Sequence, residues 1–442
     1  MEFTGKKVLI VGTGKSGVAA AELLQKKQAD LIIFDGNKEL KEEQVKEKSG
    51  AFSDAEIVLG ELPESVMEEL DLVVLSPGVP TDLPMVNAIR DKKIPIIGEI
   101  ELAYQCAKGK ILAITGTNGK TTTTALLGEI MKNYFSDVKV VGNIGIPYTS
   151  VAADTTEETV TVAEISSFQL ETAVEFRPEV SAILNITPDH LNRHHTMENY
   201  IAAKESITKN QTADDICVLN YEDEVLREFG AGLQTKVIYF SSARKLENGY
   251  YLDGTDICRA VDGKAEHICN VEELNLLGKH NYENVMAATA MAAGFGVPLE
   301  KIKEVLVRFQ AVEHRIEYVT EKRGVKFYND SKGTNPDAAI QGIRAMNRPT
   351  LLIGGGYDKQ NTYDEWIEAF DGKVKLLVLI GQTREKIAEC AKKHGMENIV
   401  LADSFEEAMD TCVKAACPGD AVLLSPACAS WGMFPNYEVR GK

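Results

Sequence analysis

The sequence predicts an α/β protein with three domains, each built on a mainly parallel β-sheet. Two observations carry this prediction. Apolar strand-like segments alternate with helical segments along most of the chain, which is the pattern of parallel strands joined by crossover helices. The length of 442 residues also exceeds what one hydrophobic core ordinarily serves, so several domains are expected.

The N-terminal part has the order of a Rossmann-like domain. Apolar strands are expected over residues 8–11, 31–34 and 72–75, and an Ala/Leu/Lys-rich helix begins near Val18. A new apolar strand over 111–114 then runs into a Gly/Thr-rich loop and a helix, as if another nucleotide-binding domain begins near Gly98. We therefore expect the first domain to span residues 1–98.

The remaining chain divides into a central and a C-terminal domain. The central one, residues 99–310, is expected to resemble a phosphate-loop ATPase sheet, with extra short antiparallel strands within the polar stretch 235–270. The C-terminal one, residues 311–442, is expected to be a second Rossmann-like doubly wound sheet. Its strands are predicted at 326–328, 350–353, 376–380, 399–401 and 421–424.

Composition excludes several classes of protein. Hydrophobic residues make up 44% and charged residues 26% of the chain, a globular rather than disordered profile. The net charge of −18 opposes binding to nucleic acid or to anionic membranes. The eight cysteines form no C-x-x-C pair, and no apolar run is long enough to span a membrane. We expect a cytoplasmic protein without nucleic-acid binding or membrane insertion.

The first motif is Gly12-x-Gly14-x-x-Gly17 after a strand, with Asp35 at the end of the next strand. This spacing is typical of a dinucleotide site, where the backbone approaches a pyrophosphate at a helix N-terminus. A nucleoside diphosphate sugar offers the same pyrophosphate. The glycines could also serve only close packing of strand and helix. The motif alone leaves these three interpretations open.

The second motif, Thr115-Gly-Thr-Asn-Gly-Lys-Thr-Thr-Thr123, joins an apolar strand to a helix. Its amides and Lys120 are suited to hold the phosphates of a nucleotide, and Thr121 is placed to ligate Mg²⁺. The spacing departs from the usual phosphate loop, because Ile114 stands five positions before Gly119. A nucleotide triphosphate is nevertheless the predicted ligand.

The third group is Glu164, in AEISSFQLE, with Asn185-Ile-Thr-Pro-Asp-His190. Both segments lie at the predicted ends of strands, at the same sheet edge as the phosphate loop. A carboxylate and an imidazole there could hold a divalent metal beside a nucleotide. His190 could equally be a hydrogen-bonded core histidine.

The C-terminal domain places polar motifs after its strands: Arg315 in EHRIE, Lys332 in NDSKGTN, Lys359 after GGGY, and Ser430-Trp431 in SPACASW. These residues lie where strands have just ended, so they are candidates to face a nucleotide across a cleft. Surface salt bridges are the alternative for Arg315 and Lys332, and a plain turn for GGGYDK.

Together these motifs resemble the Mur ligase family over essentially the whole chain. The TGTNGKTTT loop is shared with several members and with folylpolyglutamate synthases, whereas VLSPGVP, GNIG, EISSFQLE, NITPDHLNRH, EHRIE, NDSKGTNPD and SPACASWGMF resemble the D-glutamate-adding branch. The resemblance implies an ATP-dependent amide ligase that acts on UDP-N-acetylmuramoyl-L-alanine and D-glutamate through an acyl phosphate. It also implies two Mg²⁺ ions, and we expect a monomer.

The resemblance further implies a role for each matching position. Catalytic roles fall on Lys120, His190, Lys204, Arg315 and Lys332. ATP contacts fall on Gly116, Thr117, Asn118, Gly119, Lys120, Thr121, Thr122, Asn281, Asn284, Arg315, Asp330 and Lys332. Contacts to the UDP-substrate fall on Lys15, Ser16, Asp35, Gly36, Gly78, Asn143 and His190. D-glutamate contacts fall on Thr334, Lys359, Ser430, Trp431 and Tyr437. Metal ligands fall on Thr121, Glu164, His190 and, if carbamylated, Lys204.

Two departures and three rival functions accompany the resemblance. Gly36-Asn37 stands where relatives carry a Thr-Arg pair, and Trp431 replaces an aliphatic residue. Without the resemblance, Lys204 would be assigned to a solvated helix surface. The rivals are another ATP-dependent amide ligase, an NAD-dependent dehydrogenase suggested by the glycine motif, and a noncatalytic nucleotide switch. The dehydrogenase leaves the Gly-Lys-Thr loop unexplained, and the nucleotide switch leaves NDSKGTN and SPACASW unexplained.

Overall fold

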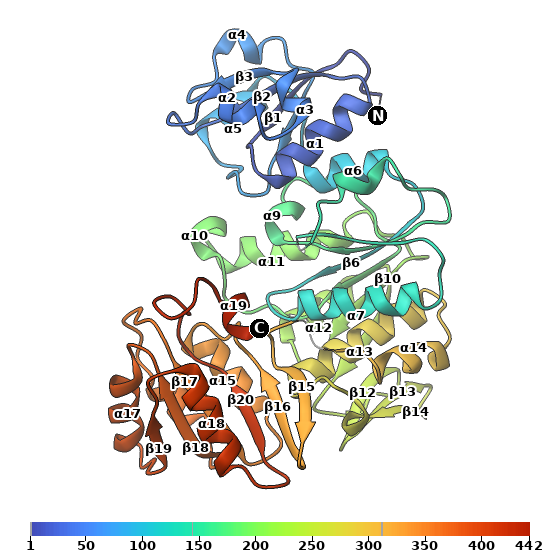
Figure 1. Ribbon diagram of the computed structural model, residues 1–442. Coiled ribbons are helices and arrows are strands. Elements are labelled where there is room, and N and C mark those ends of the chain that lie inside the picture. The colour runs from blue at the N-terminus through green and yellow to red at the C-terminus, as the bar shows by residue number, and fades with distance from the viewer. Residues whose placement is uncertain (1, 144, 311–312) are drawn as a thin grey trace. The chain divides into compact units, whose positions relative to one another are not determined.

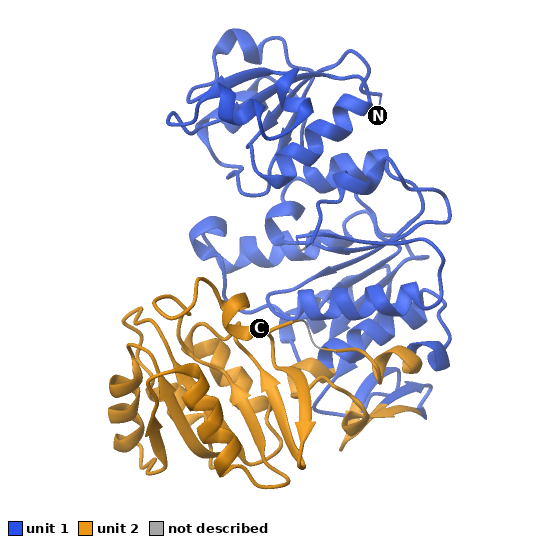
Figure 2. Ribbon diagram, in the orientation of Figure 1, with its two compact units in different colours: residues 1–251, 258–266, 283–302 blue, residues 252–257, 267–282, 303–442 orange. Residues whose placement is uncertain are grey.

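Three β-sheets organise the computed structural model, which describes residues 2–143, 145–310 and 313–442 (Figure 1). The described residues form two compact units (Figure 2). The first comprises residues 1–251, 258–266 and 283–302, and the second comprises 252–257, 267–282 and 303–442. The expected limit between residues 98 and 99 falls inside the first unit, and the limit at 311 lies outside the described residues.

The N-terminal sheet has the order β3-β2-β1-β4-β5, and every adjacent pair is parallel. Its strands are β1 Lys7–Val11, β2 Asp30–Asp35, β3 Glu56–Leu59, β4 Leu72–Leu75 and β5 Ile96–Gly98. The helices of this region are α1 Lys15–Lys26, α2 Glu42–Lys46, α3 Gly50–Ser53, α4 Glu64–Met67, α5 Pro84–Asp91 and α6 Glu99–Cys106. Strand β4 is buried throughout, as expected where a parallel sheet is covered on both faces.

The central sheet has the order β14-β13-β12-β11-β10-β9-β6-β8-β7. Its strands are β6 Lys110–Thr115, β7 Val138–Gly142, β8 Val160–Glu164, β9 Val180–Ile183, β10 Ile216–Asn220, β11 Lys236–Ser241, β12 Gly249–Asp253, β13 Asp256–Val261 and β14 Lys264–Asn270. Strand β6 lies between β9 and β8 and is parallel to both. The carboxyl ends of these three strands therefore meet at one sheet edge.

The helices of the central region complete its α/β pattern. They are α7 Lys120–Lys132, α8 Thr149–Ala152, α9 Ser167–Leu170, α10 Leu191–His194, α11 Met197–Glu205, α12 Glu224–Gly232, α13 Lys279–Gly294 and α14 Leu299–Leu306, with the 3₁₀ turns η1 Ser206–Thr208 and η2 Val271–Glu273. Helix α7 directly follows β6 and the phosphate loop, as the sequence predicts.

The expected antiparallel pairing over 235–270 is only partly correct. Strand β11 is parallel to β10, and β12 meets the end of β11 in parallel through Phe240↔Tyr250 and Ser241↔Tyr251. Gly249 permits this approach, since a Cβ there would lie 2.3 Å from the Tyr239 carbonyl oxygen. Strands β13 and β14 are joined by Asp262-Gly263, both with positive φ, which is the geometry of a tight antiparallel hairpin.

The C-terminal sheet has the order β15-β16-β20-β17-β18-β19, with β15 antiparallel to β16 and the other pairs parallel. Its strands are β15 Glu317–Lys322, β16 Val325–Asn329, β17 Thr350–Gly355, β18 Val374–Ile380, β19 Ile399–Leu401 and β20 Ala421–Leu424. The helices are α15 Pro336–Ala345, α16 Asp364–Glu368, α17 Arg384–Lys393, α18 Phe405–Ala415 and α19 Tyr437–Gly441. Every C-terminal strand predicted from sequence is present.

Two apolar clusters lie on opposite sides of this last sheet. Leu352, Leu377 and Leu423 belong to one cluster, whereas Leu351, Val378 and Val422 belong to the other. This alternation follows from the two-residue period of a strand that is covered on both faces. Among the described residues, no helix combines the length and apolar character needed to cross a membrane.

Candidate active site

In the glycine motif at the end of β1, two glycines allow close packing and one leaves the backbone open to a ligand. Gly12 has φ of +102°, and a Cβ on Gly17 would lie 2.0 Å from the Gly12 carbonyl oxygen, so these two positions require glycine for close strand–helix packing. A Cβ on Gly14 would meet nothing within 4 Å, and Gly14 is exposed at the start of α1. Lys15 and Ser16 begin the same helix, where free N–H groups favour an anion.

Asp35 is held in place by the glycine loop. Its Oδ2 accepts hydrogen bonds from the Thr13 backbone N–H at 3.2 Å and from the Thr13 hydroxyl at 2.7 Å. Lys48 Nζ donates to the Thr13 carbonyl oxygen and hydroxyl at 3.0 and 2.8 Å. The sequence reasoning missed Lys48, which places a cation beside the glycine loop. Lys48 lies in the turn between α2 and α3 and belongs to none of the motifs, so its position carries no spacing signal.

The phosphate loop connects β6 to α7 with glycine at its tightest point. Gly119 has φ of +85°, and a Cβ there would lie 2.2 Å from Asn284 Oδ1. The buried Asn284 side chain also accepts a hydrogen bond from the Thr123 hydroxyl at 3.2 Å. The structure therefore brings Asn284 to the loop, as the resemblance implies. Thr121 is half-buried and Thr122 buried in the first turn of α7.

Residues after β9 brace this loop. Asn185 Oδ1 accepts from the Asn118 backbone N–H at 2.8 Å, and Asn185 Nδ2 donates to the Asn118 carbonyl oxygen at 3.1 Å. The Thr117 hydroxyl accepts from the Thr187 N–H at 3.0 Å and lies 3.0 Å from the Tyr200 hydroxyl. Tyr200 was not among the expected site residues, and Asn185 was named only as the first residue of the third motif, although its strand-end position could have indicated this role.

Lys204 is buried, with 1% of its surface exposed, so its assignment to a solvated helix surface is wrong. Its Nζ donates to the Gly116 carbonyl oxygen at 2.7 Å and lies 4.7 Å from the centre of the Tyr200 ring. Burial, together with the charge of Lys120, lowers the pKa of Lys204 to about 7. Lys120 Nζ donates to the carbonyl oxygens of Gly116 and Thr117, each at 2.9 Å.

Glu164 is the last residue of β8, and only one of its two carboxylate oxygens accepts a hydrogen bond from the described residues. Oε1 accepts from Asn143 Nδ2 at 2.9 Å, and the Asn143 backbone N–H donates to the Glu164 carbonyl oxygen at 2.8 Å. Oε2 is buried and accepts no hydrogen bond from the described residues. A buried carboxylate oxygen without a donor is suited to a cation, so Glu164 fits the expected Mg²⁺ site. Asn143, which is an expected contact to the sugar of the UDP-substrate, is thus hydrogen-bonded to the expected metal ligand Glu164.

His190 lies at the exposed start of α10 with φ of +52°, and half of its side chain is accessible. The interpretation as a core histidine is therefore wrong. Its Nε2 lies 3.4 Å from Asp189 Oδ2, and its ring lies 4.9 Å from that of Phe168. The half-exposed ring is accessible to a ligand, and among the described residues no hydrogen bond or ion pair joins it to Glu164. Gly36 and Gly78 are likewise exposed.

In the second unit, Asp330 follows β16 and is buried. Its Oδ2 accepts from the Ser425 hydroxyl at 2.6 Å, and its Oδ1 accepts from the Ile316 N–H at 3.3 Å. Burial raises the pKa of Asp330 to about 7, although Ser425 and the charge of Arg315 act against this shift. Arg315 is exposed, and Lys332 is half-buried next to Asp330 in the same loop. Asn281 is buried and donates to the Leu277 carbonyl oxygen at 2.8 Å.

The residues expected to hold D-glutamate form two small groups. Lys359 Nζ lies 5.0 Å from the centre of the Trp431 ring, and Ser430 is buried beside Trp431 in sequence. Lys332 Nζ lies 5.9 Å from the centre of the Tyr437 ring, and the Thr334 N–H donates to the Lys332 carbonyl oxygen. A carboxylate ligand would find cations in both groups.

Comparison with known proteins identifies the family. Family models match residues 6–98 as the Mur ligase MurD-like N-terminal domain, 114–292 as the Mur ligase middle domain, and 314–428 as the Mur ligase glutamate ligase domain. A UDP-N-acetylmuramoylalanine–D-glutamate ligase from Lachnoclostridium phytofermentans is 59% identical over 441 residues, covering 100% of this chain and 97% of that protein. The chain belongs to the Mur ligase family.

Other relatives of this Mur ligase bear the same name. The protein from Lachnospira eligens is 57% identical over 443 residues, and that from Clostridioides difficile is 48% identical over 443 residues. Each alignment covers 100% of this chain and 98% of the relative. The three matched domains confirm the predicted three-domain α/β fold class.

Solved structures of other Mur ligases share the fold at low identity. The UDP-N-acetylmuramate–alanine ligase from Thermotoga maritima matches with a TM-score of 0.57 at 20% identity, covering 96% of both chains. A UDP-N-acetylmuramoyl-L-alanyl-D-glutamate–2,6-diaminopimelate ligase matches with a TM-score of 0.58 at 17% identity, covering 89% of this chain and 86% of that one. At this identity the likeness concerns the fold alone.

Proposed function

We propose that this Mur ligase joins D-glutamate to UDP-N-acetylmuramoyl-L-alanine in peptidoglycan precursor synthesis, with conversion of ATP to ADP and phosphate. The observation that carries the proposal is full-length identity of up to 59% with relatives named for this reaction. The phosphate loop with Lys120, and the strand-end carboxylate of Glu164, supply the chemistry that such a ligase needs. Neither feature is explained by a dehydrogenase.

The reaction consists of two displacements. The L-alanyl carboxylate oxygen attacks the γ-phosphorus of ATP, and ADP leaves as the acyl phosphate forms. The amine of D-glutamate then attacks the acyl carbon, loses a proton, and displaces phosphate. Lys120, Arg315 and Lys332 are the positive groups that we assign to the developing phosphate charge, while His190 orients the reacting groups.

Magnesium and ATP are assigned to the edge formed by β6, β8 and β9. Mg²⁺ would offset phosphate charge, and its expected ligands are Thr121, Glu164, His190 and carbamylated Lys204, with two ions as the fuller assignment. The open Oε2 of Glu164 supports this. The proposed ATP contacts are the ones that the resemblance implies; Asn185 is hydrogen-bonded to Asn118, and Asn284 lies next to Gly119.

Carbamylation of Lys204 is supported by its burial and its low pKa. Since the pKa is about 7, a large fraction of the amine is neutral near neutral pH and can attack CO₂, forming a carbamate and releasing one proton. The product is an anion next to Lys120 instead of a second cation. Carbon-13 NMR of protein equilibrated with labelled CO₂ tests this, since a carbamate resonance should be absent from the Lys204→Arg variant.

The remaining assignments complete the proposal. Residues 1–98 bind the UDP part of the substrate through the loop that contains Lys15 and Ser16. Residues 99–310 bind ATP, and residues 311–442 bind D-glutamate. The loop supported by Lys48 and Asp35 is open at Gly14, which favours a pyrophosphate there. Dependence on ATP favours a cytoplasmic location, and we expect a monomer.

Phosphate release from ATP with Mg²⁺ and UDP-N-acetylmuramoyl-L-alanine tests the function. D-glutamate is compared with L-glutamate, L-alanine, L-lysine and no amino acid, and the product is weighed by mass spectrometry. We expect turnover only with D-glutamate, with a product heavier by one glutamyl unit, and its loss in Lys120→Ala. Turnover with another amino acid would assign a different ligase, and reduction of a nicotinamide would assign the dehydrogenase.

A further inference from the structure

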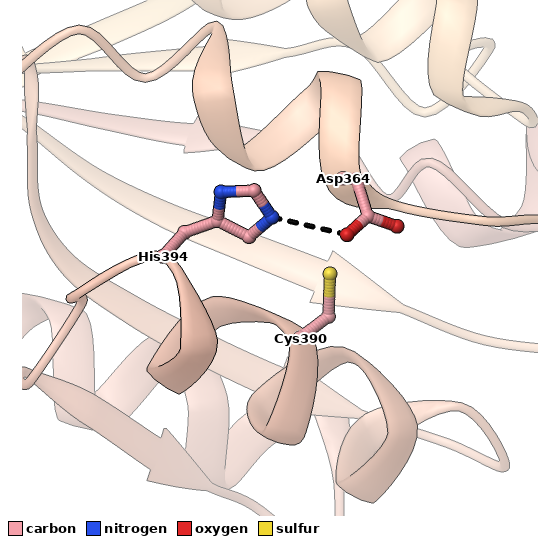
Figure 3. A group of neighbouring side chains, drawn as sticks. All are labelled: Asp364, Cys390 and His394. Atoms are coloured by element: carbon pink, nitrogen blue, oxygen red, sulfur yellow. Dashed lines mark hydrogen bonds and ion pairs between the residues drawn. The ribbon is translucent and has the colours of Figure 1, made fainter.

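Helices α16 and α17 carry a group of side chains that the proposed ligase reaction does not use (Figure 3). Asp364 is the first residue of α16, Cys390 lies on α17, and His394 directly follows α17. One donor atom from each of the three residues lies within 4.8 Å of the other two. His394 Nε2 and Asp364 Oδ1 are 3.0 Å apart. Three different ligand types thus converge from two helices.

The spacing along the chain explains this convergence. Cys390 and His394 are four residues apart, and so are Asp364 and Glu368, so each pair lies on one helix face. The second ring nitrogen of His394, Nδ1, lies 3.8 Å from Glu368 Oε1. A carboxylate at the far ring nitrogen is the usual partner of a metal-binding histidine, because it fixes the ring and increases its basicity.

Accessibility permits a ligand to enter. A quarter of the His394 side chain and more than half of the Asp364 side chain are exposed, whereas Cys390 is partly buried. In a tetrahedral zinc site with bonds of about 2.0 to 2.3 Å, neighbouring ligand atoms lie about 3 to 4 Å apart. The His394–Asp364 separation already meets this requirement, so small side-chain movements would complete the geometry.

We propose that Asp364, Cys390 and His394 bind Zn²⁺, with solvent in the fourth position and Glu368 as the partner of the His394 ring. One thiolate, one imidazole and one carboxylate form a zinc set, whereas Mg²⁺ prefers oxygen ligands alone. The site belongs to the second unit and uses none of the residues assigned to the ligase reaction. Zinc there would tie α16 to α17 and stabilise this side of the C-terminal sheet.

The thiol requires a change of protonation. Burial, followed by the charge of Asp364, raises the pKa of Cys390, so the thiol holds its proton without metal. Binding therefore releases that proton as the Zn–sulfur bond forms. The positive charge of the neighbouring Lys393 lowers the pKa of the thiol and so opposes this shift.

Titration of the full chain with Co²⁺, with Mg²⁺ in excess to occupy oxygen sites, tests the proposal through the thiolate-to-cobalt absorption band. We expect one equivalent of Co²⁺ to produce the band in the parent protein and in Cys417→Ser, which alters an exposed cysteine outside the group. The band should be absent from Cys390→Ser and strongly weakened in His394→Gln. Zn²⁺ should displace Co²⁺ and abolish the band.

Two further measurements separate a metal site from an ion-pair network. Glu368→Gln should weaken Co²⁺ binding by about 10- to 100-fold, the usual effect of removing a partner of a metal-bound histidine. Zn²⁺ should raise the midpoint of thermal unfolding in the parent protein and in Cys417→Ser, but not in Cys390→Ser. Absence of the band in the parent protein, or an equal band in Cys390→Ser, would overturn the zinc site and leave an Asp–His–Glu ion-pair network.

Discussion

Replacing Asn185 by alanine tests whether the segment after β9 holds the phosphate loop in its binding conformation. The change removes the hydrogen bonds that the Asn185 amide makes with the N–H and carbonyl of Asn118, at 2.8 and 3.1 Å. At a net value of about 1 kcal/mol each, the two bonds contribute about 2 kcal/mol. If all of this free energy orders the loop for ATP, affinity falls by about 30-fold. Because Asn185 is only half-buried, we expect a loss nearer to tenfold.

Asn210→Ala is a matched control for this measurement. Asn210 is also half-buried, and its amide donates to the carbonyl oxygens of Val174 and Phe176 at 2.9 and 3.1 Å, away from the phosphate loop. Both variants should lose a similar free energy of unfolding in urea, whereas only Asn185→Ala should bind ATP more weakly by calorimetric titration. Equal ATP affinity in the two variants would refute the bracing role of Asn185.

Three further changes probe the rest of the chain. Gly17→Ala places a Cβ 2.0 Å from the Gly12 carbonyl oxygen and should destabilise the protein by about 2 kcal/mol or more in urea, whereas Gly14→Ala, with nothing within 4 Å, should not. Asp330 has a pKa raised from 3.8 to about 7, so the folded state keeps a proton that the unfolded chain releases. Its contribution to stability is complete below pH 3.8 and is lost as pH rises through about 7, and Asp330→Asn should flatten that part of the unfolding profile. Trp431→Ala removes the ring next to Lys359 and should raise the KM for D-glutamate about two- to fivefold, the effect of about 0.5 to 1 kcal/mol at an exposed site, with kcat little changed.

Each of these three changes has a result that would contradict it. A Gly17→Ala protein as stable as Gly14→Ala would mean that the strand–helix contact relaxes freely. A stability profile of Asp330→Asn that is as steep as that of the parent protein would assign the proton uptake to another group. An unchanged KM in Trp431→Ala would remove Trp431 from the D-glutamate contacts.

Most of the fold could be predicted from local patterns. Strands such as β4 and β20 are short apolar runs bounded by turn residues. The phosphate loop is recognised by its Gly-Lys-Thr motif, which lies between an apolar strand and a helix. The parallel arrangement follows because helices separate the strands. The pairing of β11 with β12 was predicted incorrectly, because pairing direction across an irregular polar stretch depends on contacts such as that of Gly249 with Tyr239.

The site was only partly predictable for the same reason. Glycine and Gly-Lys-Thr motifs mark positions where the backbone must adopt a particular shape, so Gly119 and Lys120 are identified by sequence alone. Lys204 offers no such signal, since a lysine on a helix normally lies in solvent. Its burial beside Gly116, and hence its lowered pKa, result from packing against residues far away in sequence.

By itself the sequence determined the α/β class, the order of the strands along the chain, the phosphate loop and the resemblance to Mur ligases, because these depend on local periodicity and motif spacing. Only the tertiary structure decided that Asn185 braces Asn118, that Lys48 supports the loop next to Asp35, and that Cys390 and His394 meet Asp364. Burial, protonation and ligand geometry are set by distant neighbours in sequence, so they arise only when the chain has folded.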